Sequence, residues 1–486
     1  MNTINKVIID PSQIKQPVKA QALGLNVNFL ADHAEMRRRG QGYVTGLRQM
    51  GVRSLRYPGG EKSNEVFWSR PPWKSPRPTL SLTGPEARLV NHSKLVSADG
   101  EFQVKPMDFD EFMAICREVN AEPLICVGLG CAYVKNLPGR LQGSTRTQVI
   151  ENAVEWVRYA NQVKGYGVKY WEIGNESYWR GSVAALTAAA YTRDLLELAQ
   201  AMKAIDPTIL IGANGHVDKN YISTADADEG PIWWQYLLEH ASREIDFVVV
   251  HPYPCFEWGS YQYYLKHKPV FTDALDQVVK ALQSWAPPAD AKRIRILATE
   301  TNTFDWAASK FYRGYQTGWK WRNDLGHALV LFDLLGQHLI HPRLDMIQVW
   351  NTRWFESGSR LEDVLDNDNE LLPSGQILQL WSSSLQSHLI SIPDQEAGPA
   401  FASYSPENRI LTVFVVNKHL KERSVALGLD HYASRWRATS NVFTGKGVDD
   451  EHPVLRPGGN WQSRSPFLSL QLPPVSITVI TFEAQE

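Results

Sequence analysis

The alternation of short apolar strands with helices constrains the fold of this chain more than any other feature of its sequence. Between about residues 20 and 380, eight predicted strands alternate with helical segments. Runs such as Phe247-Val248-Val249-Val250 are apolar on both faces, as buried parallel strands require. Eight strand–helix units predict a closed (β/α)8 TIM barrel. A doubly wound open sheet is the alternative, and it is disfavoured because no glycine-rich phosphate-binding turn follows the first strand.

The predicted domain organisation follows from where this alternation stops. After Pro373 the pattern changes to short strands with a period of two, which is typical of a β-sandwich. We therefore expect a strand in residues 1–17 that joins the sandwich, a catalytic barrel over 18–378, and a sandwich over 379–486. The barrel strands are predicted at 22–29, 52–57, 123–127, 169–174, 208–212, 245–251, 294–299 and 345–350. Among the helices, single helices are predicted over 35–50 and 147–164.

Composition and charge exclude several classes of function. The net charge of −2 gives no electrostatic case for binding nucleic acid or an anionic membrane. No stretch reaches the roughly 18 apolar residues of a membrane span, and residues 1–20 lack the apolar core of a signal peptide. We expect a soluble, cytoplasmic protein, or a secreted one if a leader has been removed. The cysteines, Cys116, Cys126, Cys131 and Cys255, form no CxxC pair, so we expect reduced, buried thiols.

Polar side chains gather where the predicted barrel strands end. In a barrel of this kind the active site lies at the C-terminal ends of the strands. Packing alone would not place polar and charged residues at the same end of nearly every strand. The candidates are Asn26, Asn28, Arg56, Glu61, Asn175, Glu176, His251, Tyr253, Glu300, Asn302, Trp350 and Asn351.

Glu176 and Glu300 follow strands on opposing sides of the predicted barrel, so they can face each other across its mouth. Glycoside cleavage needs such a pair, in which one carboxyl group donates a proton and the other attacks or activates water. In a retaining enzyme the two groups lie roughly 5–5.5 Å apart. Taken singly, each glutamate is equally well explained as a helix cap or a loop ion pair. Glu172, inside a strand, is more simply an internal ion-pair partner.

Four motifs together resemble a known group of enzymes. They are the stretch from Arg56 to Gly60, the triplet Gly174-Asn175-Glu176, the pair His251-x-Tyr253, and Glu300. This combination is similar to the clan A glycoside hydrolases, and it is closest to the family 51 α-L-arabinofuranosidases. The resemblance extends from about Gly24 to Glu300 and includes the layout of barrel and sandwich.

The resemblance implies a role for each matching residue. Glu176 would be the acid/base and Glu300 the nucleophile of a retaining double displacement. Asn175 would hold the hydroxyl next to the anomeric carbon, Tyr253 would hydrogen-bond the nucleophile, and His251 would lie near the acid/base.

Further positions would shape the sugar site. Arg56 would brace the floor of the site and keep Glu300 ionised, and Trp68 matches a tryptophan that shapes the sugar pocket in the family. Trp350 and Asn351 would contact substrate from the last barrel strand.

Two positions depart from the family pattern. The family carries Glu at the position of Asn28 and Asn at the position of Glu61. Both positions would contact the terminal sugar, so this apparent exchange either preserves the hydrogen-bonding set or admits a different sugar.

The leading hypothesis is therefore a retaining exo-glycoside hydrolase, most similar to α-L-arabinofuranosidases, that acts on an oligo- or polysaccharide. Another clan A specificity is the first alternative: β-xylosidase, β-glucosidase, endo-glucanase or agarase. A non-catalytic sugar-binding barrel is the second. We expect no metal and no organic cofactor, because the chemistry needs only carboxylates and water. We expect no nucleic acid or membrane partner, and the resemblance allows a homo-oligomer.

Overall fold

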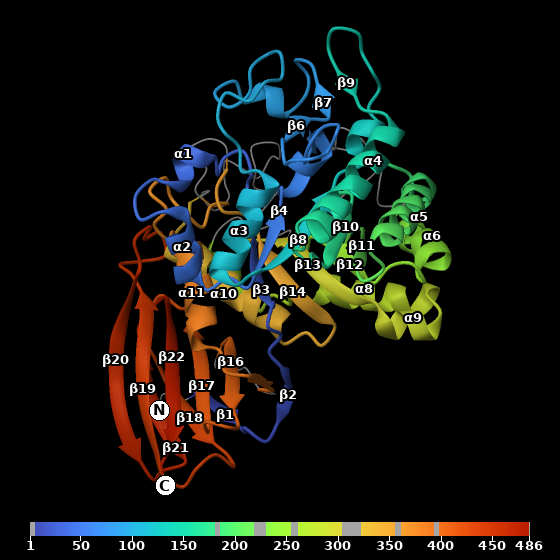
Figure 1. Cartoon of the computed structure of the whole chain (residues 1–486). Coiled ribbons are helices and arrows are strands. Elements are labelled where there is room, and N and C mark those ends of the chain that lie inside the picture. Colours follow the sequence, from blue (N-terminus) through green and yellow to red (C-terminus); the bar gives the residue numbers. More distant parts are fainter. Residues whose placement is uncertain are drawn as a thin grey trace.

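The computed structural model describes residues 5–179, 185–217, 230–253, 261–303, 322–354, 361–392 and 398–485. A barrel ringed by helices packs on a β-sandwich, which lies at the bottom of Figure 1 in orange and red. This confirms the predicted fold class. None of the helices in these ranges is long and apolar enough to cross a membrane.

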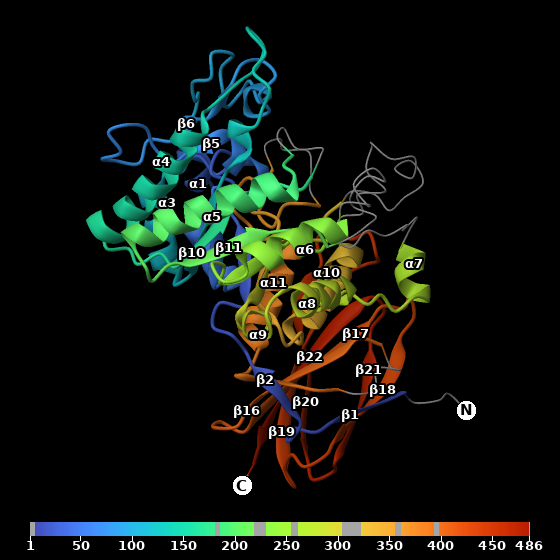
Figure 2. The ribbon, with the colours of Figure 1, turned by 90° about the vertical axis from the view of Figure 1, so that its right-hand side faces the viewer.

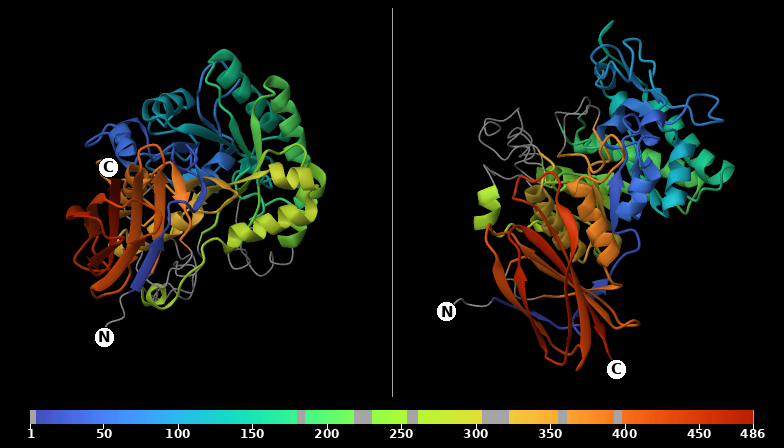
Figure 3. Two further views of the ribbon diagram at one scale, coloured as in Figure 1. Left: turned by 90° about the horizontal axis from the view of Figure 1, so that it is seen from below. Right: turned by 90° about the vertical axis from the view of Figure 1, so that its left-hand side faces the viewer.

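The barrel is a closed ring of parallel strands. Within the described ranges eight strands close it, in the ring order β3-β4-β8-β10-β11-β12-β13-β14, and β14 pairs back onto β3. Seen from below, the helices surround these strands (Figure 3). The strands are β3 (Leu23–Asn26), β4 (Ser54–Tyr57), β8 (Glu122–Val127), β10 (Tyr170–Ile173), β11 (Leu210–Asn214), β12 (Phe247–Val250), β13 (Arg295–Thr301) and β14 (Leu344–Val349).

The helices begin and end at residues that favour such positions. Asp108 and Glu111 form a capping box at the start of α3, and Asn120 ends that helix in the left-handed conformation. The helices of the described ranges are α1 (Ala34–Arg37), α2 (Tyr43–Met50), α3 (Phe109–Val119), α4 (Arg146–Val157), α5 (Ala188–Ile205), α6 (Gly230–Ala241), α7 (Tyr261–Lys266), α8 (Asp273–Trp285), α9 (Pro288–Arg293), α10 (Leu325–Leu339) and α11 (Pro373–Ser384).

Two helix predictions need correction. The helix predicted over 35–50 is interrupted between α1 and α2, because Gly40 and Gly42 have φ of 51° and 87°, outside the helical region. The helix predicted over 147–164 changes after α4 into a π-helical turn, η4 (Arg158–Val163).

The sandwich consists of two facing sheets whose apolar side chains form a common core. One sheet has the order β1-β18-β21 and the other the order β2-β15-β16-β17-β22-β19-β20, as far as the chain is described. Strand β1 pairs in parallel with β18 (Figure 2). The strands are β1 (Asn5–Ile9), β2 (Ile14–Pro17), β15 (His388–Ile390), β16 (Ala400–Ser405), β17 (Ile410–Asn417), β18 (Arg423–Leu429), β19 (Trp436–Thr444), β20 (Val454–Ser463), β21 (Phe467–Leu472) and β22 (Ser476–Ala484).

Strand β20 has no counterpart among the sandwich strands that the sequence predicts, which are 400–404, 410–417, 424–429, 436–439, 467–472 and 477–482. It contains Pro457-Gly458-Gly459, which argues against a strand, but β20 lies at the edge of its sheet, where a proline is tolerated. The boundary predicted after residue 378 falls inside α11, so we propose that the division lies after Ser384 instead.

The long segment between β4 and α3 folds over the end of the barrel where the parallel strands terminate (Figure 1). It contains the 3-10 helices η1 (Gly60–Glu65) and η2 (Leu89–Asn91). Two short ladders order the rest: β5 (Val66–Phe67) pairs with β6 (Thr79–Leu80), and β7 (Leu82–Thr83) pairs with β9 (Gln142–Gly143). Another 3-10 turn, η3 (Gly130–Ala132), follows β8.

The cysteines that the structure describes are buried thiols, as expected. Cys116, Cys126 and Cys131 are free and buried in the ranges that the structure covers. Cys255 lies outside the described residues.

An aromatic cluster joins the barrel to the sandwich. The indole of Trp381, on α11, stacks on Phe332 of α10 with ring centroids 4.3 Å apart. The same indole contacts Phe401 of β16 and Phe414 of β17, at 5.5 and 4.5 Å between centroids. A Cβ atom at Gly336 would lie 2.4 Å from the Phe401 ring, so only glycine permits this approach. The two domains therefore share one apolar core.

We predict that Trp381→Ala lowers the free energy of unfolding by about 3–5 kcal/mol, because it opens a cavity at this shared core. Urea unfolding followed by circular dichroism measures the change. As a matched control, Phe467→Ala should cost less than about 1 kcal/mol, since Phe467 is 45% exposed. Equal losses in the two variants would contradict the shared core.

Candidate active site

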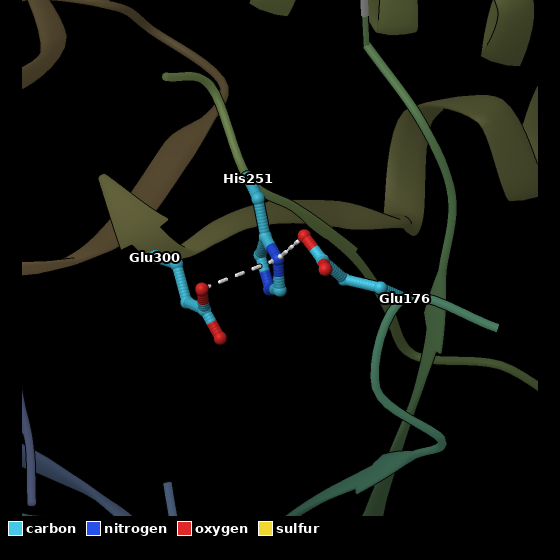
Figure 4. Close-up of side chains that lie close together, drawn as sticks. All are labelled: Glu176, His251 and Glu300. Atoms are coloured by element: carbon cyan, nitrogen blue, oxygen red, sulfur yellow. Dashed lines mark hydrogen bonds and ion pairs between the residues drawn. The ribbon is translucent and has the colours of Figure 1, made fainter. Parts of the chain in front are cut away.

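Glu176 and Glu300 meet at the mouth of the barrel. Glu176 follows β10, whereas Glu300 lies within β13, one residue before that strand ends. Their side chains are only 6% and 8% exposed. A carboxylate oxygen of Glu176 and one of Glu300 lie within 4.8 Å of each other, with the His251 imidazole beside both (Figure 4). The predicted encounter of these two side chains is present in the structure.

A tight turn after β10 delivers Glu176 to this position. Gly174 has φ of 76°, and a Cβ atom there would lie 2.3 Å from Ser177 Oγ. Glu176 itself has a φ of 45°, which is uncommon for a residue with a side chain. Asn214 holds the turn, since it accepts a hydrogen bond from Ser177 N at 3.0 Å and donates one to Ile173 O at 2.8 Å.

The floor of the site is built around the guanidinium of Arg56, which is fully buried. Arg56 donates two hydrogen bonds to Glu172, at 2.8 and 2.7 Å, and one to Glu300 Oε1 at 2.7 Å. It also donates to Asn26 Oδ1 at 2.9 Å and to Asn175 Oδ1 at 2.7 Å. The internal ion pair predicted for Glu172 is thereby confirmed. The guanidinium of Arg56 thus forms an ion pair with both Glu172 and Glu300.

Tyr253 and His251 complete the surroundings of the carboxylates. The Tyr253 hydroxyl donates a hydrogen bond to Glu300 Oε2 at 3.0 Å. His251 Nδ1 lies 2.8 Å from Glu176 Oε1 and 3.7 Å from Glu300 Oε2. His251 Nε2 lies 3.1 Å from Thr299 Oγ1, which fixes the plane of the ring. The two glutamates thus have different partners: Glu300 faces a cation and a hydroxyl donor, and Glu176 faces an imidazole.

The electrostatics of His251 follow from these contacts. Burial disfavours its charged form, but the negative charge of Glu300 and the hydrogen bond and charge of Glu176 outweigh burial. The pKa of His251 is therefore raised above its usual value.

Asn175 presents an unused donor at the site. Its Oδ1 accepts from Arg56, but its buried Nδ2 has no hydrogen-bond partner among the described residues. Asn64 fixes the backbone here: its Nδ2 donates to Asn175 O at 3.1 Å, and its Oδ1 accepts from Gly130 N at 3.2 Å. The free amide hydrogens of Asn175 are therefore available for a ligand.

The end of β14 supplies another wall. A Cβ atom at Gly60 would lie 2.3 Å from the Trp350 ring and 3.0 Å from Glu300 Oε1, so the indole edge packs close to this carboxylate. Asn351 is completely buried, and neither polar atom of its side chain has a hydrogen-bond partner in the described part of the chain.

Three predicted site residues are not joined to this group. Trp68 is buried in an aromatic cluster and donates its indole hydrogen bond to Asn152 O, so it offers no face to a sugar. Asn28 uses both side-chain groups on the backbone, accepting from Ala31 N and donating to Arg353 O. Glu61 pairs with Arg88 in the covering segment. The residues that the structure does bring together are Arg56, Asn175, Glu176, His251, Tyr253, Glu300, Trp350 and Asn351.

Several residues that hold the site together were identified only weakly, or not at all, from the sequence. Asn26 was a candidate only as a strand-end residue, and Asn64, Asn214 and Thr299 carry no motif of their own. Lys62, which is buried beside Trp350, looks in the sequence like a loop cation. The signal for Asn26 was its place at the end of a barrel strand. Thr299, the last residue of the strand predicted over 294–299, and Asn214, which ends β11, carry the same signal, whereas Asn64 and Lys62 lie in a predicted loop without one.

The site also holds atoms that suit a metal ion. Glu176, His251 and Glu300 each offer one ligand atom, and these atoms lie within 4.8 Å of one another. Cleavage of a glycoside by two carboxyl groups needs no such ion.

Comparisons with known proteins agree with the predicted resemblance. Residues 46–246 match the family model of the α-L-arabinofuranosidase 1 domain. A probable α-L-arabinofuranosidase C from Aspergillus niger is 26% identical over 197 residues, which cover 36% of this chain and 32% of that protein. An intracellular exo-α-(1→5)-L-arabinofuranosidase from Acetivibrio thermocellus is 26% identical over 222 residues, covering 43% and 37%. The matched region spans about a third of the length of these relatives.

Solved structures extend the likeness to the whole fold. An α-L-arabinofuranosidase from Thermotoga maritima, in an arabinose complex, superposes with a TM-score of 0.72 at 19% identity, over 98% of this chain and 99% of that one. A bifunctional glucanase-xylanase from a metagenome library gives 0.66 at 15% identity, over 100% of both chains. The comparisons confirm the resemblance to clan A and family 51.

We predict that Arg56→Met lowers the free energy of unfolding by about 3–5 kcal/mol, because it leaves Glu172 buried without its cation. The double variant Arg56→Met/Glu172→Gln should recover more than half of this loss. Urea unfolding of the two variants checks the prediction. A double variant no more stable than the single one would contradict the role of this ion pair.

We predict that the pKa of His251 lies above about 6.5 in the native protein and falls in Glu300→Gln and Glu176→Gln. Because the folded value is raised, His251 contributes stability below its unfolded pKa and loses that contribution as the pH rises through the folded value. NMR titration of histidine side chains labelled with 15N measures the shift. An unchanged pKa in both variants would show that the carboxylates do not control this imidazole.

Proposed function

We propose that this chain is a retaining, exo-acting glycoside hydrolase that releases α-L-arabinofuranosyl groups from oligo- or polysaccharides. The observation that carries this proposal is the closeness of Glu176 and Glu300, whose carboxylate oxygens lie within 4.8 Å. Retaining enzymes keep their two carboxyl groups roughly 5–5.5 Å apart, whereas inverting enzymes need roughly 6.5–9.5 Å to admit a water molecule. The distance therefore favours direct attack by a carboxylate.

In the first step Glu300 attacks the anomeric carbon while Glu176 donates its proton to the leaving oxygen. The bond between the anomeric carbon and the leaving oxygen breaks, and an ester between sugar and Glu300 forms. Arg56 and Tyr253 orient the attacking carboxylate through hydrogen bonds of 2.7 and 3.0 Å. The Glu300 carboxylate is therefore already oriented for attack and need not change its conformation.

In the second step Glu176, now a carboxylate, removes a proton from water. The resulting hydroxide attacks the anomeric carbon and frees Glu300, so the product keeps its anomeric configuration. His251 Nδ1 lies 2.8 Å from Glu176 Oε1, within hydrogen-bonding distance of the carboxylate after the proton has left. The contact between these two side chains thus supports the change of role between the steps.

Two side chains support the binding of a sugar hydroxyl. Asn175 has a buried Nδ2 group without a partner among the described residues, and Asn351 has two such atoms. A buried polar group without a partner costs stability, and a hydroxyl that pairs with it recovers that cost. We propose that Asn175 binds the hydroxyl beside the anomeric carbon and that Trp350 and Asn351 form the opposite wall.

The arabinofuranosyl specificity rests on the named relatives, most of which are α-L-arabinofuranosidases. The likeness to a glucanase-xylanase of similar fold favours, as a second candidate, another clan A specificity such as β-xylosidase, β-glucosidase, endo-glucanase or agarase. A sugar-binding barrel without catalysis is disfavoured because both carboxylates are present and close. The intracellular relative supports a cytoplasmic location, and a homo-oligomer stays a prediction.

We predict that Glu300→Ala reduces hydrolysis of 4-nitrophenyl α-L-arabinofuranoside to the uncatalysed background. Glu176→Ala should slow cleavage of unactivated arabino-oligosaccharides by about 10²–10⁴-fold, because these need a general acid. In Glu176→Ala, added azide should restore turnover of the nitrophenyl glycoside and yield a glycosyl azide of retained configuration, since azide needs no general base. Initial rates and NMR of the products measure these outcomes.

Glu118→Ala, which alters an exposed glutamate, is the matched control and should keep the native rate. A panel of nitrophenyl glycosides that includes xyloside, glucoside and galactoside distinguishes the candidate specificities. Native activity in Glu300→Ala, or an inverted product from the native enzyme, would overturn the assigned mechanism.

A further inference from the structure

Lys62 is a buried cation in the active-site region to which the mechanism above gives no part. It lies in η1, directly after the turn that follows β4, and is only 3% exposed. Burying an ammonium group costs free energy unless nearby groups compensate. What surrounds Lys62 therefore indicates why it is there.

Aromatic rings face the ammonium group. Lys62 Nζ lies 4.5 Å from the centroid of the Trp350 ring and 4.7 Å from that of Trp354. The two indoles are themselves in contact, with centroids 6.0 Å apart. A cation within about 6 Å of a ring centroid is attracted to the ring, most strongly for tryptophan. Lys62 thus holds two indoles together on one side of the site.

This aromatic group is continuous with the proposed nucleophile. The Trp350 ring packs against Gly60, where a Cβ atom would lie 2.3 Å from the ring and 3.0 Å from Glu300 Oε1. Tyr253, which donates a hydrogen bond to Glu300, belongs to the same apolar cluster as Trp350 and Trp354. A displacement of the Trp350 ring would therefore shift the carboxylate of Glu300.

We propose that Lys62 is a positioning residue for the reaction: its ammonium group fixes the indoles of Trp350 and Trp354 and, through the Trp350 ring, the place of the Glu300 carboxylate. The proposal rests on the proposed function, in which Glu300 is the nucleophile.

The charged groups around Lys62 come from several elements. Glu300 on β13, Glu362 after β14 and Asp32 after β3 favour its charged form, and Arg56 on β4 opposes it. Burial is the largest effect, and it lowers the pKa of Lys62 to about 7. Burial also raises the pKa of Glu362 to about 7, against the charges of Lys62 and Arg88.

The attraction between Lys62 and the two indoles depends on pH. Below a pH of about 7 Lys62 carries the charge that attracts the rings, and above that pH the charge is lost. The contribution of Lys62 to kcat/KM is therefore present at acidic pH and absent at alkaline pH.

The test is the pH profile of kcat/KM for 4-nitrophenyl α-L-arabinofuranoside in Lys62→Met. The good leaving group of this substrate reduces the need for protonation by Glu176. We expect kcat/KM of Lys62→Met to be lowered by about three- to tenfold at pH 5 and to match that of the native enzyme at pH 9, where the native lysine is neutral. Lys62→Arg should restore the native value at pH 5. Lys94→Met, at an exposed lysine, should leave the profile unchanged.

A loss of kcat/KM in Lys62→Met that is equal at pH 5 and pH 9, or no loss at all, overturns the proposal, whatever happens to the melting temperature. If Lys62→Met does not fold, Glu362→Gln replaces it. This change removes a carboxylate that favours the charged lysine, so Lys62 loses its proton, and kcat/KM begins its alkaline decline, at a lower pH than in the native enzyme. An unaltered profile overturns the proposal. Native activity in Glu300→Ala would instead refute the proposed function itself.

Discussion

The buried guanidinium of Arg56 is the interaction on which the rest of the site depends. It joins β4 to β10 through Glu172 and to β13 through Glu300, so one side chain connects opposite parts of the barrel wall. An arginine suits this place because its planar fork serves several acceptors at once and stays charged when buried. Glu172 neutralises part of that charge permanently. Glu300 then experiences a cation that is held in place and screened from water, which is the condition under which electrostatic stabilisation is strongest.

The barrel determines where the reacting groups lie, and small residues determine how closely they approach. Gly174 allows the turn that presents Glu176, and Gly60 allows the Trp350 ring to lie against Glu300. Neither position accepts a Cβ atom without displacement of a neighbour. Asn214 accepts a hydrogen bond from Ser177 N and Asn64 donates one to Asn175 O, and these two bonds fix the backbone on either side of Glu176. The two carboxylates are thus positioned by glycine and asparagine residues of the neighbouring turns.

Much of this arrangement could be predicted from the sequence, because it depends on the period of the pattern and on the ends of strands. Arg56, Glu176, His251 and Glu300 each lie at a strand end, and the closure of a barrel brings such ends together. Trp68 was assigned to the sugar pocket by spacing along a loop, and a loop path cannot be derived from spacing. It instead packs on Trp156 and Tyr159. Strand β20 was missed because proline and glycine are tolerated at an edge, where no neighbouring strand needs their hydrogen bonds.

The pairing of β1 with β18 also bears on how the chain is assembled. Asn5 lies opposite Val425, so β1 can pair with β18 only after most of the polypeptide has left the ribosome. Contacts between residues so distant in sequence form late, because a long loop must close before they contribute. Meanwhile the strand–helix units of the barrel are largely local and can fold as they emerge. During synthesis the apolar segment from Val7 to Ile9 therefore stays without its neighbour until β18 has been made, and a chaperone that covers it would protect the chain in that interval.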